Sequence, residues 1–203
     1  MVKRRPVLST ILGIGIFHGL YSDGVDRLWT PFMLFLKFPE FDGLTTVTWF
    51  GFIRVGSILL GIAANEIARR RVNTTDESSI RRALFATNAA MVVALIAFAA
   101  SPNIFIAIVA HWAWSLLRQT HSPLYTTWVN QRLDSQVRAT VISMSSQVDA
   151  LGQIIGGPIV GAIGTAISLR AALLSSAAIL TPVLALFARA NKTADDRAQT
   201  VDG

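Results

Sequence analysis

Six long apolar segments make up most of this chain, and their lengths constrain its fold more than any other feature. A helix crosses the hydrocarbon core of a bilayer with about 20 apolar residues. Each segment is continuously apolar and lacks the alternating pattern of a barrel strand, so helices are expected. Only 15% of the residues are charged, against about 25% in a typical soluble domain. The sequence therefore predicts an all-α, polytopic membrane protein with transmembrane helices over residues 8–35, 45–68, 80–100, 104–127, 138–163 and 169–188.

The two ends of the chain differ from the apolar segments between them. Residues 1–188 are predicted to form one six-helix transmembrane bundle, and the polar residues 189–203 a disordered cytoplasmic tail. The basic start followed by an apolar run imitates a secretory signal. Because it has no A-x-A-like cleavage site, an uncleaved first span is expected. Pro123 is expected to kink or end the fourth membrane segment.

Basic residues are distributed unevenly between the loops. If the loops alternate between the two sides of a membrane, Lys37 and Arg170 fall on one side and thirteen basic residues on the other. Cytoplasmic loops carry such an excess, so both termini are expected in the cytoplasm and the chain in the plasma (inner) membrane. The spread of these charges over several loops argues against nucleic-acid binding. The thirteen are Lys3, Arg4, Arg5, Arg69, Arg70, Arg71, Arg81, Arg82, Arg132, Arg138, Arg189, Lys192 and Arg197.

Several kinds of chemistry are excluded by missing residues. The chain has no cysteine, which excludes disulfides, thiolate nucleophiles and Cys-type metal sites. No GxSxG, Walker or HExxH motif occurs, and His111 and His121 have no metal-ligand spacing to an acid. We therefore expect no catalytic residue, no metal site and no cofactor.

Residues 22–31, SDGVDRLWTP, interrupt the first apolar segment with three charges. Asp23 and Asp26 are three residues apart and Arg27 follows Asp23 by four, so in one helix they share a face. Ionised groups near the bilayer centre cost about 2.5–3.5 kcal/mol each on insertion scales unless they are paired or hydrated. Arg54 in the second segment is the expected partner. Two interpretations stay open: an ion-pair cluster that joins two helices, or a group that handles substrate or protons.

The fifth apolar segment carries a second set of polar residues on one predicted helix face. Asp149 and Gln153 are four residues apart, and Ser143, Ser146 and Gln147 precede them. A carboxylate within a membrane segment, with no neighbouring base to neutralise it, is a functional-site hypothesis by default. We therefore expect Asp149 to take part in substrate or proton handling.

A histidine and a tryptophan extend this hypothesis. His18 precedes Asp23 by little more than one helical turn and is a candidate member of a proton path, although a solitary histidine is more often an interhelical hydrogen-bond donor. Trp112 is a candidate for the wall of an apolar pocket, whereas aromatic residues such as Trp128 are typical of the membrane interface.

Three pairs of glycines are four residues apart, a spacing that lets helix backbones approach closely. We expect most of them to serve ordinary helix packing. The pairs are Gly15 and Gly19, Gly152 and Gly156, and Gly157 and Gly161.

Three stretches resemble the C-terminal half of a major facilitator superfamily transporter, helices seven to twelve of twelve. HGLYSDGVDRLWTPFML resembles the seventh helix of drug-efflux-like members. GIAANEIARRR, residues 61–71, is similar to the cytoplasmic G-x-x-x-D-R-x-G-R-R loop of the family, and WVNQRLDSQVRATVISMSSQVDALGQIIGGPIVGAIG resembles the tenth-to-eleventh loop and eleventh helix. The stretches occur in the family's order and together cover much of the chain. The resemblance implies one six-helix half of a twelve-helix fold.

The loop motif departs from the family pattern. Gly61, Arg69 and Arg70 match it, but Asn65 stands at the position of the usual acid and Glu66 at that of the following base. In the family this loop pairs charges with neighbouring helix ends and governs the conformational switch. The resemblance therefore implies a conformational gating loop here, with Glu66 as the available substitute for the missing acid.

The resemblance implies alternating-access transport, with proton-coupled movement or efflux of a small amphiphilic solute. The expected substrate and proton path comprises His18, Asp23, Asp26, Arg27, Arg54, Trp112, Gln147, Asp149 and Gln153. One six-helix half exposes a polar face, so a partner is expected besides the lipid bilayer. The alternatives are a second six-helix half from another chain, a homodimer, or a truncated, non-transporting membrane subunit whose buried charges are structural.

Overall fold

The computed structural model describes residues 5–40, 44–71, 76–133 and 135–199, and the regular secondary structure in these ranges is helical. Each predicted segment corresponds to one helix, which confirms the all-α class. The charged decapeptide, residues 22–31, lies inside the first helix and does not form a loop. The elements are α1 (Arg5–Phe35), α2 (Thr46–Arg71), α3 (Glu77–Ala100), α4 (Ile104–Arg132), α5 (Ser135–Ala166) and α6 (Leu169–Gln199).

Two helices extend further than predicted. α4 continues through Pro123 to Arg132, so this proline does not end the helix. Around it, the Thr127 hydroxyl donates to the Pro123 carbonyl at 2.9 Å, within the same helix. α6 stays helical to Gln199, although residues 189–203 were expected to be disordered. Residues 189–199 include three alanines, two arginines and one lysine, whose high helix propensity favours this extension.

Side-chain caps begin two of the helices. Asp76 starts α3 by accepting hydrogen bonds from the backbone N–H groups of Ser78 (3.0 Å) and Ser79 (3.1 Å). Both serine hydroxyls donate to the same carboxylate at 2.7 Å. These bonds, first that of the Ser79 hydroxyl, hold the pKa of Asp76 well below its ordinary value. Asn103 starts α4 in the same way, through the N–H of Ile106 at 3.0 Å.

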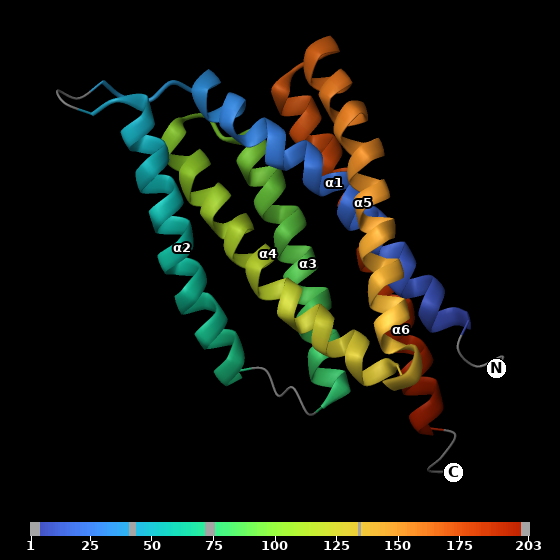
Figure 1. Ribbon diagram of the computed structural model, residues 1–203. Helices are drawn as coiled ribbons and strands as arrows, with labels where there is room; N and C mark the ends of the chain where they lie inside the picture. The colour runs from blue at the N-terminus through green and yellow to red at the C-terminus, as the bar shows by residue number, and fades with distance from the viewer. Residues whose placement is uncertain (1–4, 41–43, 72–75, 134, 200–203) are drawn as a thin grey trace.

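Successive helices run in opposite directions, so the bundle has two ends (Figure 1). The start of α1, the end of α2, the start of α3, the α4–α5 turn and the end of α6 lie at the same end. Arg69 and Arg70 at the end of α2 and Arg81 and Arg82 at the start of α3 belong to that end. Successive loops therefore lie at opposite ends of the bundle, as was assumed when the basic residues were assigned to two sides of a membrane.

The helices pack as two sets of neighbours around a shared contact. α1 packs mainly on α5 and α6, whereas α4 packs on α2 and α3. α3 and α6 join the two sets, whereas the backbones of α1 and α4 approach each other at few points and these helices meet through side chains. Exchanging α1, α2 and α3 for α4, α5 and α6 converts one set of neighbours into the other. The packing thus follows a repeat of three helices.

Glycines bring the backbones of α1 and α5 into direct contact. A Cβ atom at Gly152 would lie 2.6 Å from the carbonyl oxygen of Ile16, and at Gly19 or Gly156 it would overlap a carbonyl oxygen of the facing helix. A backbone carbonyl cannot move aside for a methyl group, so these positions require glycine. Gly161, by contrast, faces open space and makes no such contact.

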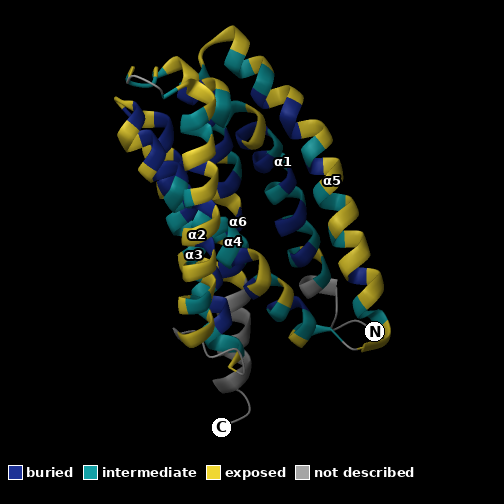
Figure 2. Cartoon of the chain, turned by 60° about the vertical axis from the view of Figure 1, so that its left-hand side comes forward, coloured by how far each residue is buried: buried dark blue, intermediate teal, exposed yellow. Residues whose placement is uncertain are grey.

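Four helices, α2, α3, α5 and α6, are long and apolar enough to cross a membrane. Large apolar side chains cover outward surfaces, such as Phe52 and Ile62 on α2 and Ile154 on α5. Figure 2 shows exposed residues along the outer side of α5 and buried ones along the neighbouring α1. A large exposed apolar surface marks a site of protein or membrane contact. Together with the four apolar helices, it describes a membrane-embedded protein.

α1 and α4 were also expected to span the membrane but are not among these four helices. Their lengths, 31 and 29 residues, are sufficient. Polar residues lower their apolar character, notably His18 and Asp26 in α1 and Arg118 and His121 in α4. These four side chains line cavities between helices. Polar residues that make α1 and α4 less apolar are therefore the ones that line these cavities.

Candidate functional site

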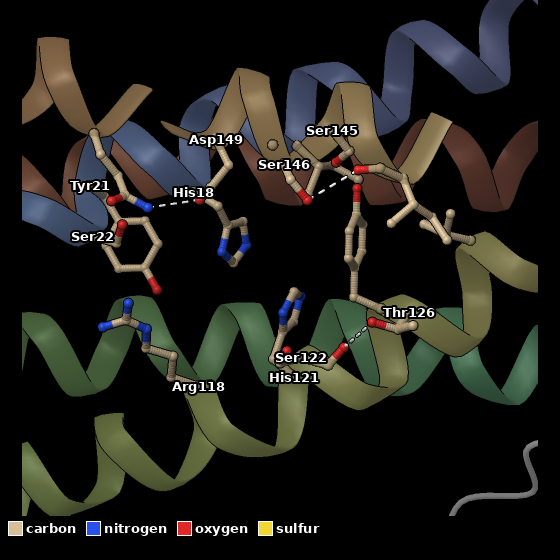
Figure 3. Close-up of a pocket in the computed structure, with 16 residues that line it drawn as sticks. His18, Tyr21, Ser22, Arg118, His121, Ser122, Thr126, Ser145, Ser146 and Asp149 are labelled. Atoms are coloured by element: carbon tan, nitrogen blue, oxygen red, sulfur yellow. Dashed lines mark hydrogen bonds between the residues drawn. The ribbon is translucent and has the colours of Figure 1, made fainter. Parts of the chain in front are cut away.

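A cavity of about 340 Å³ lies between α1, α4 and α5 (Figure 3). Asp149 is the one acid and Arg118 the one guanidinium among the described residues that line it. The amide of Gln153 donates to the Asp149 carboxylate at 2.8 Å, as the spacing of four residues suggested. Hydroxyl groups from α1, α4 and α5 complete the lining. This cavity, the Asp149 pocket, offers a carboxylate and several hydroxyls to a ligand.

Two imidazole rings stack at the wall of the Asp149 pocket (Figure 3). His18 of α1 and His121 of α4 have ring centroids 4.7 Å apart and an interplanar angle of 18°. Nδ2 of Asn88, on α3, lies 2.8 Å from Nε2 of His121 and also donates to the Leu84 carbonyl at 3.1 Å. Because an amide nitrogen is a donor, Nε2 of His121 accepts. The stack thus joins the pocket to a fully buried amide in the core.

A second cavity, of about 420 Å³, lies between α1, α2 and α4. Arg54 and Arg118 line it, together with the acid Asp26. Part of its wall is aromatic: Trp29 stacks on His111 with centroids 4.7 Å apart and an interplanar angle of 21°. This cavity, the Arg54 pocket, lies nearer to the end of α1 and to the start of α4 than the Asp149 pocket does.

Arg118 lines both pockets and joins α4 to α1. Its guanidinium donates to the two carboxylate oxygens of Asp26 at 2.6 and 2.9 Å and lies 5.3 Å from the centre of the Trp114 ring. The hydroxyl of the buried Tyr21 is directed toward it (Figure 3). Arg118 was not predicted from the sequence as a site residue. A charged residue within the fourth apolar segment satisfies the same rule that singled out Asp149.

The charged residues of α1 pair differently from the prediction. Asp23 accepts a hydrogen bond from Arg27 at 2.7 Å, as expected, but its carboxylate turns toward α5. Asp26 pairs with α4 instead, so the two acids serve different helix contacts. The predicted ion pair of Arg54 with these acids is not found among the described residues. Arg118 takes that place, because α4 presents it directly to Asp26.

Four predicted path residues line neither pocket: Asp23 and Arg27, which pair with each other, and Gln147 and Trp112. Gln147 is exposed, and it points away from the Asp149 pocket because two residues along a helix differ in direction by about 200°. Trp112 packs its ring against Gly56 of α2, and its Nε1 donates to the Ile53 carbonyl at 3.0 Å. Trp112 therefore contributes to the α2–α4 contact and not to a pocket wall. The prediction of one shared polar face on the fifth segment was too broad.

The predicted gating loop forms a compact ion cluster at the end of α2. Glu66 accepts hydrogen bonds from Arg69 at 3.0 and 3.1 Å and from Arg70 at 2.7 Å. All three side chains belong to one helix, at spacings of three and four residues. Asn65 is exposed beside them, and Gly61 packs against the side chain of Gln119 on α4. Glu66 therefore does bind both arginines, but within its own helix.

A second ion cluster at the same end of the bundle joins two helices. Glu77, in the first turn of α3, pairs with Arg81 one turn later at 3.0 Å and with Arg132 at the end of α4. The Arg81 side chain is almost fully buried, so it depends on this pairing. From the sequence, Arg81 and Arg132 were expected only to indicate how the chain is oriented in the membrane.

Comparison with protein-family models and with curated protein sequences found no match. The candidate site is therefore described from its geometry alone. Two polar pockets lie along α1 and α4, and the Arg118–Asp26 pair lies between them. In the part of the chain that the structure describes, no three histidine or acidic residues are grouped as a metal site would require. The arrangement offers room for a charged or polar small molecule beside the Asp149 carboxylate.

Proposed function

We propose that this chain is a six-helix half of a transporter of the major facilitator type, which moves a small amphiphilic solute by alternating access. The observation that carries the proposal is that the two polar pockets meet at Arg118, between α1 and α4. Transporters of this type bind solute near the bilayer midplane, between helices of opposing repeats. The pockets have the size and the mixture of polar and aromatic groups that suit such a solute.

The order of helix packing supports the choice of this transporter type. Each half of such a transporter consists of two three-helix repeats with inverted topology. In this chain, exchanging α1–α3 for α4–α6 preserves the main helix contacts, and the first helices of the two repeats, α1 and α4, line both pockets. On this proposal α1 and α4 cross the membrane with the other four helices, and both termini lie on the cytoplasmic side of the plasma membrane.

The polar surface of α1 and α4 supports a partner that covers it. The side chains of Arg27 and Asp26 are 72% and 47% exposed. Charged groups facing lipid cost about 2.5–3.5 kcal/mol each on insertion scales. A second six-helix half, or a second copy of the chain, removes this cost by offering a polar surface of its own. The solute path then lies between the two halves.

Asp149 supports coupling to protons. It is partly buried, and its hydrogen bond in this structure comes from a neutral amide. Protonation of this carboxylate therefore alters the charge of the pocket that a solute enters. His18 and His121 lie at the same wall. Glu66, with Arg69 and Arg70, takes the gating role at the end of α2.

Flux measurements test the proposal. The purified chain is reconstituted in vesicles with a pH gradient, and proton movement is followed with a pH-sensitive dye while candidate amphiphilic solutes are added. We expect solute-dependent proton flux that Asp149→Asn abolishes and Gln147→Ala leaves intact. Gln147 is the matched control because it lies on the same helix but outside both pockets. A folded protein, with its partner half present, that shows no solute-dependent flux would contradict transport.

A second candidate, a non-transporting membrane subunit, is favoured by the local pairing of most acids in the described bundle. Asp23, Asp26, Glu66 and Glu77 all have arginine partners. Two of these acids, Asp26 and Glu77, pair with an arginine of another helix, and such pairs hold helices together without any solute. On this interpretation Arg118→Gln lowers the melting temperature in detergent, and neither the wild type nor the variant shows solute-dependent proton flux.

A further inference from the structure

We propose that the Arg54 pocket binds a small organic anion, a carboxylate or sulfonate that carries an apolar body. As the substrate class of a transport path, this inference rests on the proposed function. As a binding site, it rests only on the side chains between α1, α2 and α4.

The charges of the pocket leave one guanidinium uncompensated. Arg118 and Arg54 both line the cavity, and Asp26 is the only acid among the described residues that line it. Asp26 directs both carboxylate oxygens to Arg118. No described carboxylate forms an ion pair with Arg54. The pocket therefore carries one net positive charge, held by Arg54.

An unpaired arginine within an apolar helix calls for an anion. Arg54 lies well inside α2, which is among the helices apolar enough to cross a membrane. A guanidinium in that setting is costly unless it is paired or hydrated. Its planar group of N–H donors matches a carboxylate or sulfonate in geometry as well as charge.

The pocket wall supplies a further polar group and an apolar surface. His111 is 7% exposed, and its Nδ1 atom has no hydrogen-bond partner among the described residues. Trp29 and Trp114 present aromatic faces, and Ile53 and Ile58 add apolar surface. A volume of about 420 Å³ falls within the usual range for small-molecule sites. The ligand that fits is an anion with an apolar chain or ring.

The neighbouring Asp149 pocket has the opposite preference. Its arginine is the same Arg118, already bound by Asp26, while Asp149 adds a negative charge. An organic anion is therefore expected in the Arg54 pocket and not beside Asp149. The two pockets distinguish the sign of a ligand's charge along one pair of helices.

The tryptophans of the pocket provide a direct binding assay. Bromine quenches tryptophan fluorescence by contact, so 8-bromooctanoate is added to the purified chain in an uncharged detergent, with an 8-bromooctyl trimethylammonium salt as the cationic control. We expect saturable quenching by the anion only. Arg54→Gln should weaken anion binding about 10-fold or more, since hydrogen bonds to charged groups have that weight. Arg54→Lys should retain part of the affinity.

Arg27→Gln is the matched control. Arg27 lies on α1 but pairs with Asp23 beside α5 and does not line the pocket, so its removal should leave the affinity unchanged. Melting temperatures establish that each variant is folded. Equal affinity in Arg54→Gln, equal quenching by the cation, or quenching that never saturates would each overturn the proposal.

Two arms identify the source of the anion. In nanodiscs, displacement of 8-bromooctanoate by phosphatidylglycerol but not by phosphatidylcholine assigns the site to an anionic lipid headgroup. Retention of binding in phosphatidylglycerol assigns it to a soluble anion.

An absence of anion binding, with Arg54→Gln converting a dimer into a monomer, shows that a second copy pairs with Arg54 and rejects the site. Anion binding without flux rejects transport alone, and flux without Arg54-dependent binding rejects only the anion site.

Discussion

Arg118 of α4 holds both carboxylate oxygens of Asp26 of α1, at 2.6 and 2.9 Å, although the backbones of the two helices approach each other at few points. A bidentate pair fixes the relative position of both side chains more firmly than a single contact. Because Arg118 lines both cavities, this pair also forms the boundary between them.

The Arg118–Asp26 pair should show a measurable but modest coupling energy. The side chains are 38% and 47% exposed, and solvent weakens ion pairs of this exposure, so we expect about 1 kcal/mol. The measurement is a double-mutant cycle with Arg118→Gln and Asp26→Asn, followed by unfolding in detergent. The cycle of Asp26→Asn with Arg170→Gln is the control, because Arg170 binds carbonyl groups of α3 and its turn instead. Equal coupling in both cycles would argue against the pair.

Gly156→Ala should destabilise the bundle, whereas Gly161→Ala on the same helix should not. The added methyl group at position 156 would overlap the backbone of Leu20 on α1, and overpacking of this kind costs about 1–3 kcal/mol. Position 161 faces open space, so alanine there is neutral or stabilises by up to about 1 kcal/mol through helix propensity. Melting temperatures of the two variants in one detergent decide the matter. Similar shifts would mean that α1 and α5 do not meet at these glycines.

The helices, and positions on them where backbones approach closely, could be predicted from the sequence. Continuous apolar segments separated by short polar connections predict each of the six helices, although the helices extend beyond several of the predicted bounds. The glycine spacing in the first and fifth segments indicated a close contact, and Gly19, Gly152 and Gly156 make it. Asp149 and Gln153 bond to each other because spacing within one helix fixes their relation.

The partners across helices could not be predicted in the same way. Periodicity tells which residues share a face of one helix, but not which helix that face meets. Arg54 and Arg118 are both charged residues within apolar segments, so composition alone does not show which of them pairs with Asp26. The stack of His18 on His121 likewise joins residues far apart in the chain. Only the packing of α1 against α4 and α5 brings these groups together.

Replacing Asp76 with serine should make the protein less sensitive to acid. Hydrogen bonds from Ser79 and Ser78 hold the pKa of this carboxyl below its ordinary value. Its contribution to stability is therefore complete above the unfolded pKa of about 3.9 and is lost as the pH falls below that value toward the folded pKa. Serine also caps a helix but does not titrate in this range. The melting-temperature advantage of the wild type over Asp76→Ser should shrink between pH 7 and pH 3, and a constant difference would exclude the carboxylate as the titrating cap.

Asn88→Ala should both destabilise the core and alter the His121 ring. The substitution removes the donor to Nε2 of His121, a buried group with little access to water, at a cost of about 1–3 kcal/mol. Thr87→Ala is the control, because Thr87 bonds only to the Ala83 carbonyl of its own helix in this structure; we expect a change within about 0.5 kcal/mol. Imidazole ¹⁵N chemical shifts should move in Asn88→Ala and not in Thr87→Ala. The ring of His121 stacks on His18 at the pocket wall. Unchanged shifts would therefore show that the Asn88 amide does not affect the histidines of the Asp149 pocket.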